Sequence, residues 1–358
     1  MTKSPSRAWA EIDFDAMRRN LDVVKKHAPG QDVMIVIKAD AYGHGMIETA
    51  RAMETEKPSF FGVANAGEAR KLHEAGISVT PYILGATLPA EREEIVARGW
   101  TPCLCSLEEI AHFESLGPVS AHLALDTGMG RGGFLPEQIG TAIAALKKSD
   151  HITLTGIGSH LPVADEDAAF TRSQFETFDR LAEEIQQEFP RKLAIHLSNS
   201  AGLLDFKSRT TTMVRPGLML YGISPRPIYQ NKLTPVMTLK TRISLIHRLP
   251  KGHGVSYGRT LLNRATKAAI LGIGYGDGYS RAIQDGEVLI QGARCPLLGR
   301  VTMDQIIVDV TDLDHCQTGD EVILFGKDLL ISELSQKAGT IPWELFTQIM
   351  PRVPRFHL

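Results

Sequence analysis

Between Asp32 and about Pro225, short apolar runs of strand length alternate with longer segments whose apolar residues recur at helical spacing. Repeated alternation of this kind is typical of parallel strands joined by right-handed crossovers. Eight such units within about 190 residues predict a (β/α)8 (TIM) barrel, with a doubly wound open sheet as the alternative. The expected strands are Val33–Ile37, Phe60–Val63, Pro81–Leu84, Pro102–Leu104, Val119–Leu125, Ile152–Ile157, Lys192–His196 and Thr212–Val214.

After Pro235 the pattern changes to β-branched runs separated by Gly, Asp and Pro, with clear helical spacing only near Ser332–Ala338. Such a pattern is typical of an all-β domain. The prolines between 225 and 235 interrupt periodicity and mark the boundary. The overall prediction is an α/β fold, with an N-terminal barrel domain over residues 8–230 and a C-terminal all-β domain over residues 231–358.

Composition excludes several classes of partner. The 358 residues include 39 Lys and Arg against 41 Asp and Glu, and the net charge of −2 argues against nucleic acid or an anionic membrane. No apolar run reaches the ~18 residues of a membrane helix, and Met1–Asp15 lacks the apolar core of a signal peptide. Four cysteines make no disulfide scaffold, and the Cys103-x-Cys105 pair lacks a second pair at zinc-ligand spacing. We therefore expect no metal and a reducing, cytoplasmic compartment.

The first expected strand ends directly in Lys38, before a glycine-rich turn that contains Tyr42 and His44. Burying an ammonium group without compensation costs several kcal/mol, so a lysine at the end of a core strand needs an explanation. The ordinary explanation is a side chain that reaches solvent at the barrel rim. The functional one is a nucleophile or base whose pKa is lowered by desolvation.

Polar segments follow the later strands at equivalent positions. Asp126–Arg131 follows the fifth strand, and Ser159-His160, Ser198–Ser200 and Arg215–Gly217 follow the next three. Barrel active sites are assembled at the carboxyl ends of the strands, and the last two turns commonly hold phosphate on backbone N–H groups. A strand-end lysine beside such a cradle suggests a Schiff-base cofactor such as pyridoxal phosphate (PLP). The residues expected to share the pocket are Lys38, Arg131, His160, Asn199, Ser200 and Arg215.

A competing motif is Gly254–Gly258, which matches the G-x-S-x-G nucleophile elbow of hydrolases. That elbow requires an apolar strand before the serine and a helix after it. Here a turn at 249–253 precedes the motif and no apolar helical period follows it, so a hydrolase is disfavoured.

Several of these motifs together resemble those of the alanine racemases, which are PLP enzymes of fold-type III. Val36–Gly45 resembles their PLP-lysine motif, Ser256–Gly258 the motif of their catalytic tyrosine, and Gly299–Asp304 their substrate-carboxylate loop. The resemblance extends from about Ala8 to Arg355. It implies interconversion of L- and D-alanine for peptidoglycan synthesis by a head-to-tail homodimer. Further matching segments are Asp126–Arg131, Met213–Gly217 and Arg352–Arg355.

The resemblance assigns two bases, Lys38 on one face of the substrate Cα and Tyr257 on the other. Two opposed bases allow a proton to leave one face and return on the other. It implies that Arg131 approaches the substrate carboxylate and that His160 lies near the catalytic tyrosine. Arg215 at the pyridine nitrogen stays protonated and so weakens the ring as an electron sink. The implied phosphate ligands are Tyr42, Ser200, Gly217 and Leu218, and the groups expected from the partner subunit are Tyr257, Tyr275, Met303 and Asp304.

Two positions depart from the family pattern. Ala124 occupies the place where family members often carry a carbamylated lysine bonded to the pocket arginine. We expect Arg131 to be oriented instead by another carboxylate, a bound anion or main chain. Pro351 replaces a tyrosine that narrows the substrate entrance, which leaves open a broader racemase of small amino acids such as serine. A fold-related PLP decarboxylase and a non-catalytic PLP carrier are disfavoured by Arg215 and Tyr257.

Overall fold

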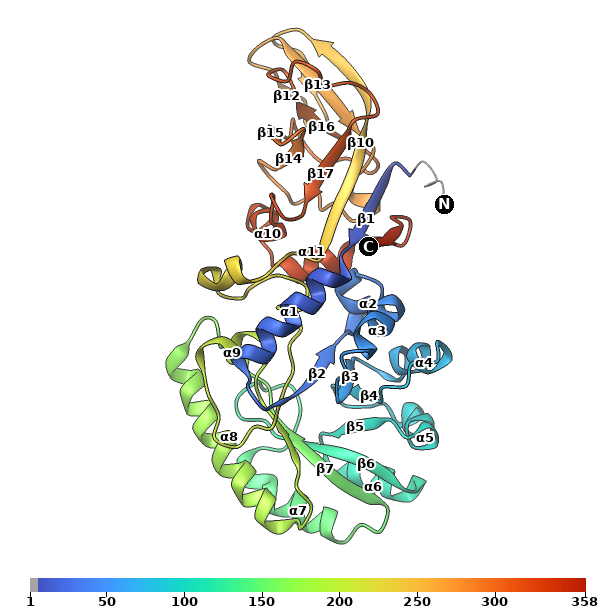
Figure 1. The fold of residues 1–358 in the computed structure, drawn as a ribbon, viewed down its shortest axis with the longest axis vertical. Helices are drawn as coiled ribbons and strands as arrows, with labels where there is room; N and C mark the ends of the chain where they lie inside the picture. Colours follow the sequence, from blue (N-terminus) through green and yellow to red (C-terminus); the bar gives the residue numbers. More distant parts are fainter. Residues whose placement is uncertain (1–5) are drawn as a thin grey trace.

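The computed structural model describes residues 6–358 and shows two parts stacked along the long axis of the molecule (Figure 1). The first five residues of the polar N-terminal segment lie outside the described residues. The N-terminal part is a closed barrel of parallel strands, which confirms the predicted barrel and excludes the open sheet. In order around the barrel the strands are β2 (Asp32–Val36), β3 (Phe60–Val63), β4 (Pro81–Ile83), β5 (Thr101–Leu104), β6 (Val119–Ala124), β7 (Ile152–Gly158), β8 (Ala194–His196) and β9 (Met213–Val214).

Helices cover the outside of the barrel because alternate strand residues face two different apolar layers. In β2, Val33 and Ile35 join the main core with the helices, whereas Met34 joins a separate cluster with Tyr82, Cys103 and Ala124 inside the barrel. The helices of this part are α1 (Phe14–His27), α2 (Lys38–Gly43), α3 (Met46–Glu54), α4 (Ala66–Glu74), α5 (Pro89–Arg98), α6 (Leu107–Leu116), α7 (Ile139–Lys147), α8 (Ala168–Glu188) and α9 (Ser200–Asp205).

The helix starts follow side-chain acceptors in the sequence. Asp13, Asn65 and Ser106 each accept a backbone N–H in the first turn of the helix that follows, and Asp167 accepts two at the start of α8. These caps satisfy N–H groups that have no partner inside the helix. They therefore fix where each crossover leaves the strand end and enters its helix.

The C-terminal part is strand-rich, as predicted. Its main sheet is built on the long β10 (Met237–Leu249), which pairs antiparallel with β13 (Thr266–Leu271) and β17 (Glu321–Phe325). Two helices, α10 (Ile331–Ala338) and α11 (Pro342–Gln348), follow the sheet, and only the first was expected from the sequence. The remaining strands are β11 (Gly254–Val255), β12 (Thr260–Leu261), β13 (Thr266–Leu271), β14 (Glu287–Ile290), β15 (Ala293–Pro296), β16 (Ile306–Asp309), β17 (Glu321–Phe325) and β18 (Arg355–His357), with short 3-10 turns at Pro136–Gln138, Pro227–Lys232 and Tyr275–Asp277.

The first strand, β1 (Ala8–Ile12), lies in the C-terminal sheet and not in the barrel. It pairs antiparallel with β10 and parallel with β18, so both ends of the chain meet in this sheet (Figure 1). The expected domain of residues 8–230 therefore begins with a strand that belongs to the other part. The exact division of the chain at residue 230 stays a prediction.

Within residues 6–358, no helix is long and apolar enough to span a membrane. The same residues contain no group of three or more His, Cys, Asp or Glu side chains that could hold a metal ion. The four cysteines are free thiols.

Candidate active site

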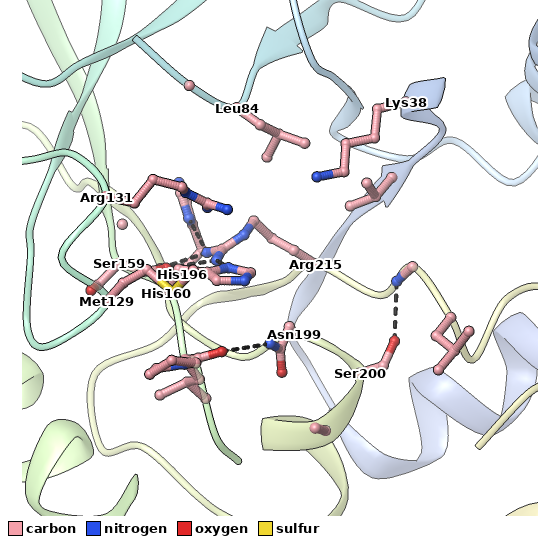
Figure 2. A pocket seen from close by; sticks show the side chains of 18 of the residues that line it. Lys38, Leu84, Met129, Arg131, Ser159, His160, His196, Asn199, Ser200 and Arg215 are labelled. Carbon is pink, nitrogen blue, oxygen red and sulfur yellow. Dashed lines mark hydrogen bonds between the residues drawn. The ribbon is translucent and has the colours of Figure 1, made fainter. Parts of the chain in front are cut away.

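A cavity of about 790 Å³ opens at the carboxyl ends of the barrel strands. Parallel strands of a barrel end on one face, so side chains that follow different strands meet there. Figure 2 shows the Lys38 ammonium and the Arg131 guanidinium pointing into this cavity beside Arg215. The predicted site residues that line it are Lys38, Tyr42, Arg131, His160, Asn199, Ser200, Arg215, Gly217 and Leu218.

Lys38 is carried by an unusual backbone turn. The four residues after it, Ala39 to Tyr42, have φ between 52° and 54°, which is the left-handed region. The Glu68 carboxylate accepts the N–H of Ala39 at 2.8 Å and that of Ala64 at 2.8 Å, so α4 holds the start of this turn. Neither feature was predicted from the sequence, since alanine has no preference for left-handed backbone.

The environment of Lys38 favours the neutral amine. Burial lowers the pKa of its ammonium, and Arg131 and Arg215 lower it further, while Glu68 acts in the opposite direction. This direction agrees with the functional explanation of Lys38, not with a side chain that only reaches solvent at the rim. A lysine with a lowered pKa can act as a nucleophile or accept a proton near neutral pH.

Arg215 is buried and held by several acceptors. Its Nη1 donates to His196 Nδ1 at 2.6 Å and to the His196 carbonyl at 2.9 Å, and its Nη2 donates to the Ser159 carbonyl at 2.6 Å (Figure 2). Nη2 also donates to His160 Nδ1 at 3.3 Å. Burial and the charges of Arg215, Arg131 and Lys38 lower the pKa of His160 to about 3. His160 is therefore neutral and accepts a hydrogen bond from the guanidinium.

A second buried histidine continues this chain into the barrel interior. Arginine only donates, so His196 Nδ1 must accept and its Nε2 must carry the proton. That N–H then donates to His122 Nδ1 at 2.8 Å. Burial, followed by the charge of Arg215, lowers the pKa of His122 to about 3. Neither His122 nor His196 was predicted from the sequence as a site residue, although a histidine within an apolar strand is a usable signal.

The turns after β8 and β9 form a narrow cradle. Ser200 Oγ accepts the N–H of Gly217 at 3.1 Å and that of Met219 at 3.2 Å. A Cβ on residue 217 would lie 2.7 Å from the Tyr42 hydroxyl, so only glycine fits against that phenol. Burial raises the pKa of Tyr42 to about 12, which keeps its hydroxyl protonated as a donor. A small anionic group such as a phosphate fits these donors.

The loop that carries Arg131 is fixed by Asp126. One oxygen of this buried carboxylate accepts the N–H groups of Gly128 and Met129 at 2.9 Å and of Gly130 at 3.1 Å. Within residues 6–358, no carboxylate or main-chain carbonyl pairs with the Arg131 guanidinium. Of the three groups that we expected to orient Arg131 in place of a lysine at position 124, the carboxylate and the main chain are thus not seen. A bound anion stays a prediction.

The other four predicted site residues do not line the cavity of their own chain; they lie in the C-terminal part. Tyr257, Tyr275 and Met303 are 65%, 40% and 54% exposed. Their loops are joined, because Tyr275 N donates to the Thr302 carbonyl at 2.9 Å and Ser256 Oγ donates to the Arg300 carbonyl at 2.6 Å. We call Tyr257, Tyr275, Met303 and Asp304 the exposed cluster.

Arg352 fastens two loops of this cluster to each other. Its Nε contacts Asp277 at 2.7 Å and its Nη2 contacts Asp304 at 2.8 Å. Ser256 meanwhile sits between the two short strands β11 and β12, with no helix after it. The segment is a hairpin and not a nucleophile elbow, so the structure also argues against a hydrolase.

Comparison with known proteins gives a consistent result over nearly the whole chain. Residues 12–225 match the family model of the alanine racemase N-terminal domain, and residues 236–357 match that of the C-terminal domain. The alanine racemase of Carboxydothermus hydrogenoformans is 38% identical over 98% of this chain and 99% of its own. That of Halothermothrix orenii is 37% identical over 97% of this chain and 96% of its own.

Solved structures agree. The alanine racemase of Clostridium difficile 630 superposes with a TM-score of 0.93 at 32% identity, covering 99% of this chain and 97% of that one. The alanine racemase from Bacillus anthracis with bound L-Ala-P superposes with a TM-score of 0.90 at 29% identity, covering 99% of this chain and 95% of that one.

Proposed function

This chain belongs to the alanine racemase family, and from that premise we propose that it interconverts L- and D-alanine with PLP held in the barrel cavity. The observation that carries the proposal is the half-buried Lys38 just after a strand end, with a lowered pKa, in the same cavity as the fixed guanidinium of Arg215. The product D-alanine would supply peptidoglycan synthesis, and we expect the reaction in the cytoplasm.

The residues present fit this cofactor. Lys38 would bind its aldehyde carbon, and Arg215 would face the pyridine nitrogen. The cradle that a Cβ at Gly217 would fill matches the phosphate, held by Tyr42 and Ser200 with the backbone of Gly217 and Leu218. Asn199 and His160 line the cavity beside it. When bound, PLP supplies an electron-withdrawing ring that acidifies the Cα proton of an amino acid.

Side chains of the protein then remove a proton from one face of the substrate Cα and return a proton to the other face. Lys38 Nζ accepts a proton from one face, and its lowered pKa increases the fraction of neutral amine available to do so. Arg215 cannot give up its own proton, so the group it faces remains a hydrogen-bond acceptor. Arg131 binds the substrate carboxylate through charge-assisted hydrogen bonds. His160 is neutral and contributes as a hydrogen-bonding group, not as a cation.

The resemblance assigns the opposite face to Tyr257, which does not line the cavity of its own chain. We propose that the exposed cluster of a second copy enters the cavity mouth in a head-to-tail homodimer, so that Tyr257 of that copy serves the other face. The exposure of Tyr257, a large aromatic side chain at a loop tip, supports this arrangement. Each site would then combine two chains, and a monomer would be inactive.

The function is tested by incubating the protein with PLP and L-alanine in D2O. We expect loss of optical rotation together with deuteration at Cα, and no racemisation by Lys38→Ala. A protein that binds PLP at Lys38 but leaves alanine unchanged would contradict the proposal.

Subunit complementation tests the shared site. Lys38→Ala and Tyr257→Phe are each expected to be inactive. A mixed dimer of the two would hold one intact site, with Lys38 from one chain and Tyr257 from the other, and would regain activity. Mixed dimers that form but stay inactive would exclude the shared site.

Serine is the second candidate substrate. Pro351 stands in an exposed turn and does not line the cavity of its own chain. A broader entrance would admit L-serine beside L-alanine. Turnover of L-serine below about a thousandth of the L-alanine rate, a difference of about 4 kcal/mol in barrier, would restrict the enzyme to alanine.

A further inference from the structure

Two cysteines face the same cavity from one strand and its end. Cys103 lies in β5 and is buried in the barrel interior, where it packs with Tyr82 and Ala124. Cys105 comes two residues later and packs against the same cluster. Side chains two residues apart on a strand point to the same side. Both thiols line the cavity that holds Lys38 and Arg131.

The two cysteines pack in one cluster with Tyr82 and line the same cavity wall. Cys105 Sγ also lies 3.7 Å from the Cys103 carbonyl, and its backbone N–H is held by Glu109 at 2.7 Å. The sulfur is 3.8 Å from where a Cβ of Gly132 would stand, which places it against the loop of Arg131. These contacts hold the Cys105 sulfur beside Cys103 before any ligand binds.

The surroundings act in opposite directions on the two thiols. The interaction with Cys105, then Tyr82 and the charge of Arg215, lowers the pKa of Cys103 against the opposing effect of burial, whereas the interaction with Cys103 and burial raise the pKa of Cys105. Thiolates are the reactive form of cysteine and prefer soft partners. Cys103 is therefore the more acidic of the two thiols that face the cavity, and it is expected to attack a soft electrophile first.

We propose that Cys103 and Cys105 form a dithiol binding site for monosubstituted trivalent arsenicals in the wall of the active-site cavity. In the reaction R–As=O + 2 R′SH → R–As(SR′)2 + H2O, two S–H bonds and the As=O bond break. Two As–S bonds form, both protons leave in the water, and no atom is oxidised or reduced.

The geometry favours this ligand over two others. Two residues of extended strand span about 6.6 Å between Cα atoms, at the upper end of the ~4.4–6.8 Å that a disulfide tolerates. An arsenic atom bonded to both sulfurs lengthens the bridge, so the short Cα–Cα distance that a direct S–S bond needs is no longer required. Zinc needs about four ligands, and the described residues offer no group of three or more candidate ligand side chains.

The site is tested with the reduced full-length protein and phenylarsine oxide, by intact mass in excess glutathione. We expect one adduct per chain that resists glutathione and is removed by dimercaptopropanol. Cys103→Ser and Cys105→Ser should each weaken this retention by roughly 10²-fold or more, because the second attachment becomes impossible. The matched control is Cys295→Ser with Cys316→Ser, which removes the two buried cysteines of the C-terminal part and should change nothing.

Retention of the resistant adduct in either single variant, or its loss in the control, would overturn the proposal. Peptide mapping of the wild-type protein after iodoacetamide labelling tests the same site without any substitution. The arsenical should protect Cys103 and Cys105 from iodoacetamide, and protection of the other two cysteines instead would refute it. None of these readouts requires PLP binding or racemase activity, so failure of the proposed function leaves them unaffected.

Discussion

The left-handed turn after Lys38 stores conformational energy at the site, and replacing Ala39 by glycine should release part of it. A non-glycine residue in the left-handed helical region costs about 1–2 kcal/mol. Four consecutive residues, Ala39 to Tyr42, therefore cost roughly 4–8 kcal/mol, a sum comparable with the whole stability of many domains. The bond from Ala39 N–H to Glu68 is one of the contacts that hold the turn.

Ala39 is exposed, so Ala39→Gly changes the backbone preference and little packing. Relief of about 1–2 kcal/mol is offset by about 0.5–1 kcal/mol from the greater freedom of unfolded glycine. The expected result is a gain of about 0–1.5 kcal/mol. Ala144→Gly is the matched control, since Ala144 is also exposed but lies in the ordinary helix α7 of the same barrel. It should lose about 1 kcal/mol.

Urea unfolding followed by far-UV circular dichroism measures both variants on the same transition. We expect Ala39→Gly to unfold at a higher midpoint than Ala144→Gly and to show a lower kcat, because a freer turn positions the Lys38 amine less firmly. A loss of stability equal to that of Ala144→Gly would refute the claim that the turn is strained.

Three further outcomes are expected. The Glu109 carboxylate lies 3.6 Å from the guanidinium of Arg92, whose side chain is only 9% exposed, so Glu109→Ala leaves a buried positive charge without its partner. The free energy of unfolding measured with urea should fall by about 3–5 kcal/mol, and a loss under ~1 kcal/mol would contradict this. Arg352→Ala disconnects two loops of the exposed cluster, so it should raise KM and lower kcat with little change in melting temperature, and Arg352→Lys should restore part of the activity. The free energy of unfolding should be highest above a pH of about 6.5 and should fall as the pH drops toward about 3–4. The reason is that buried histidines become protonated in the unfolded chain at a higher pH than in the folded protein, where they are neutral. A urea midpoint that is equal at about pH 7.5 and pH 5 would contradict this. The histidines are His44, His122 and His160, whose pKa values burial lowers to about 4, 3 and 3.

The sequence by itself determined the barrel and the location of the cavity. Apolar periodicity reports which face of each element is buried, and parallel strands necessarily end together. Polar segments after the first and the fifth to eighth strands therefore predicted a shared pocket, and the structure places Lys38, Arg131, His160, Asn199, Ser200 and Arg215 around it. The strand-rich C-terminal part followed from its β-branched runs in the same way.

Only the tertiary structure decided which groups act on one another. The His122–His196–Arg215 chain joins β6, β8 and the turn after β9, and the hydrogen bond from Ala39 N–H to Glu68 joins the lysine turn to α4. The placement of β1 in the C-terminal sheet depends on pairing with residues more than two hundred positions away. Local sequence encodes burial and backbone preference, whereas these contacts depend on how distant elements pack. The left-handed turn even opposes its local preference, because packing and hydrogen bonds outside the segment stabilise it.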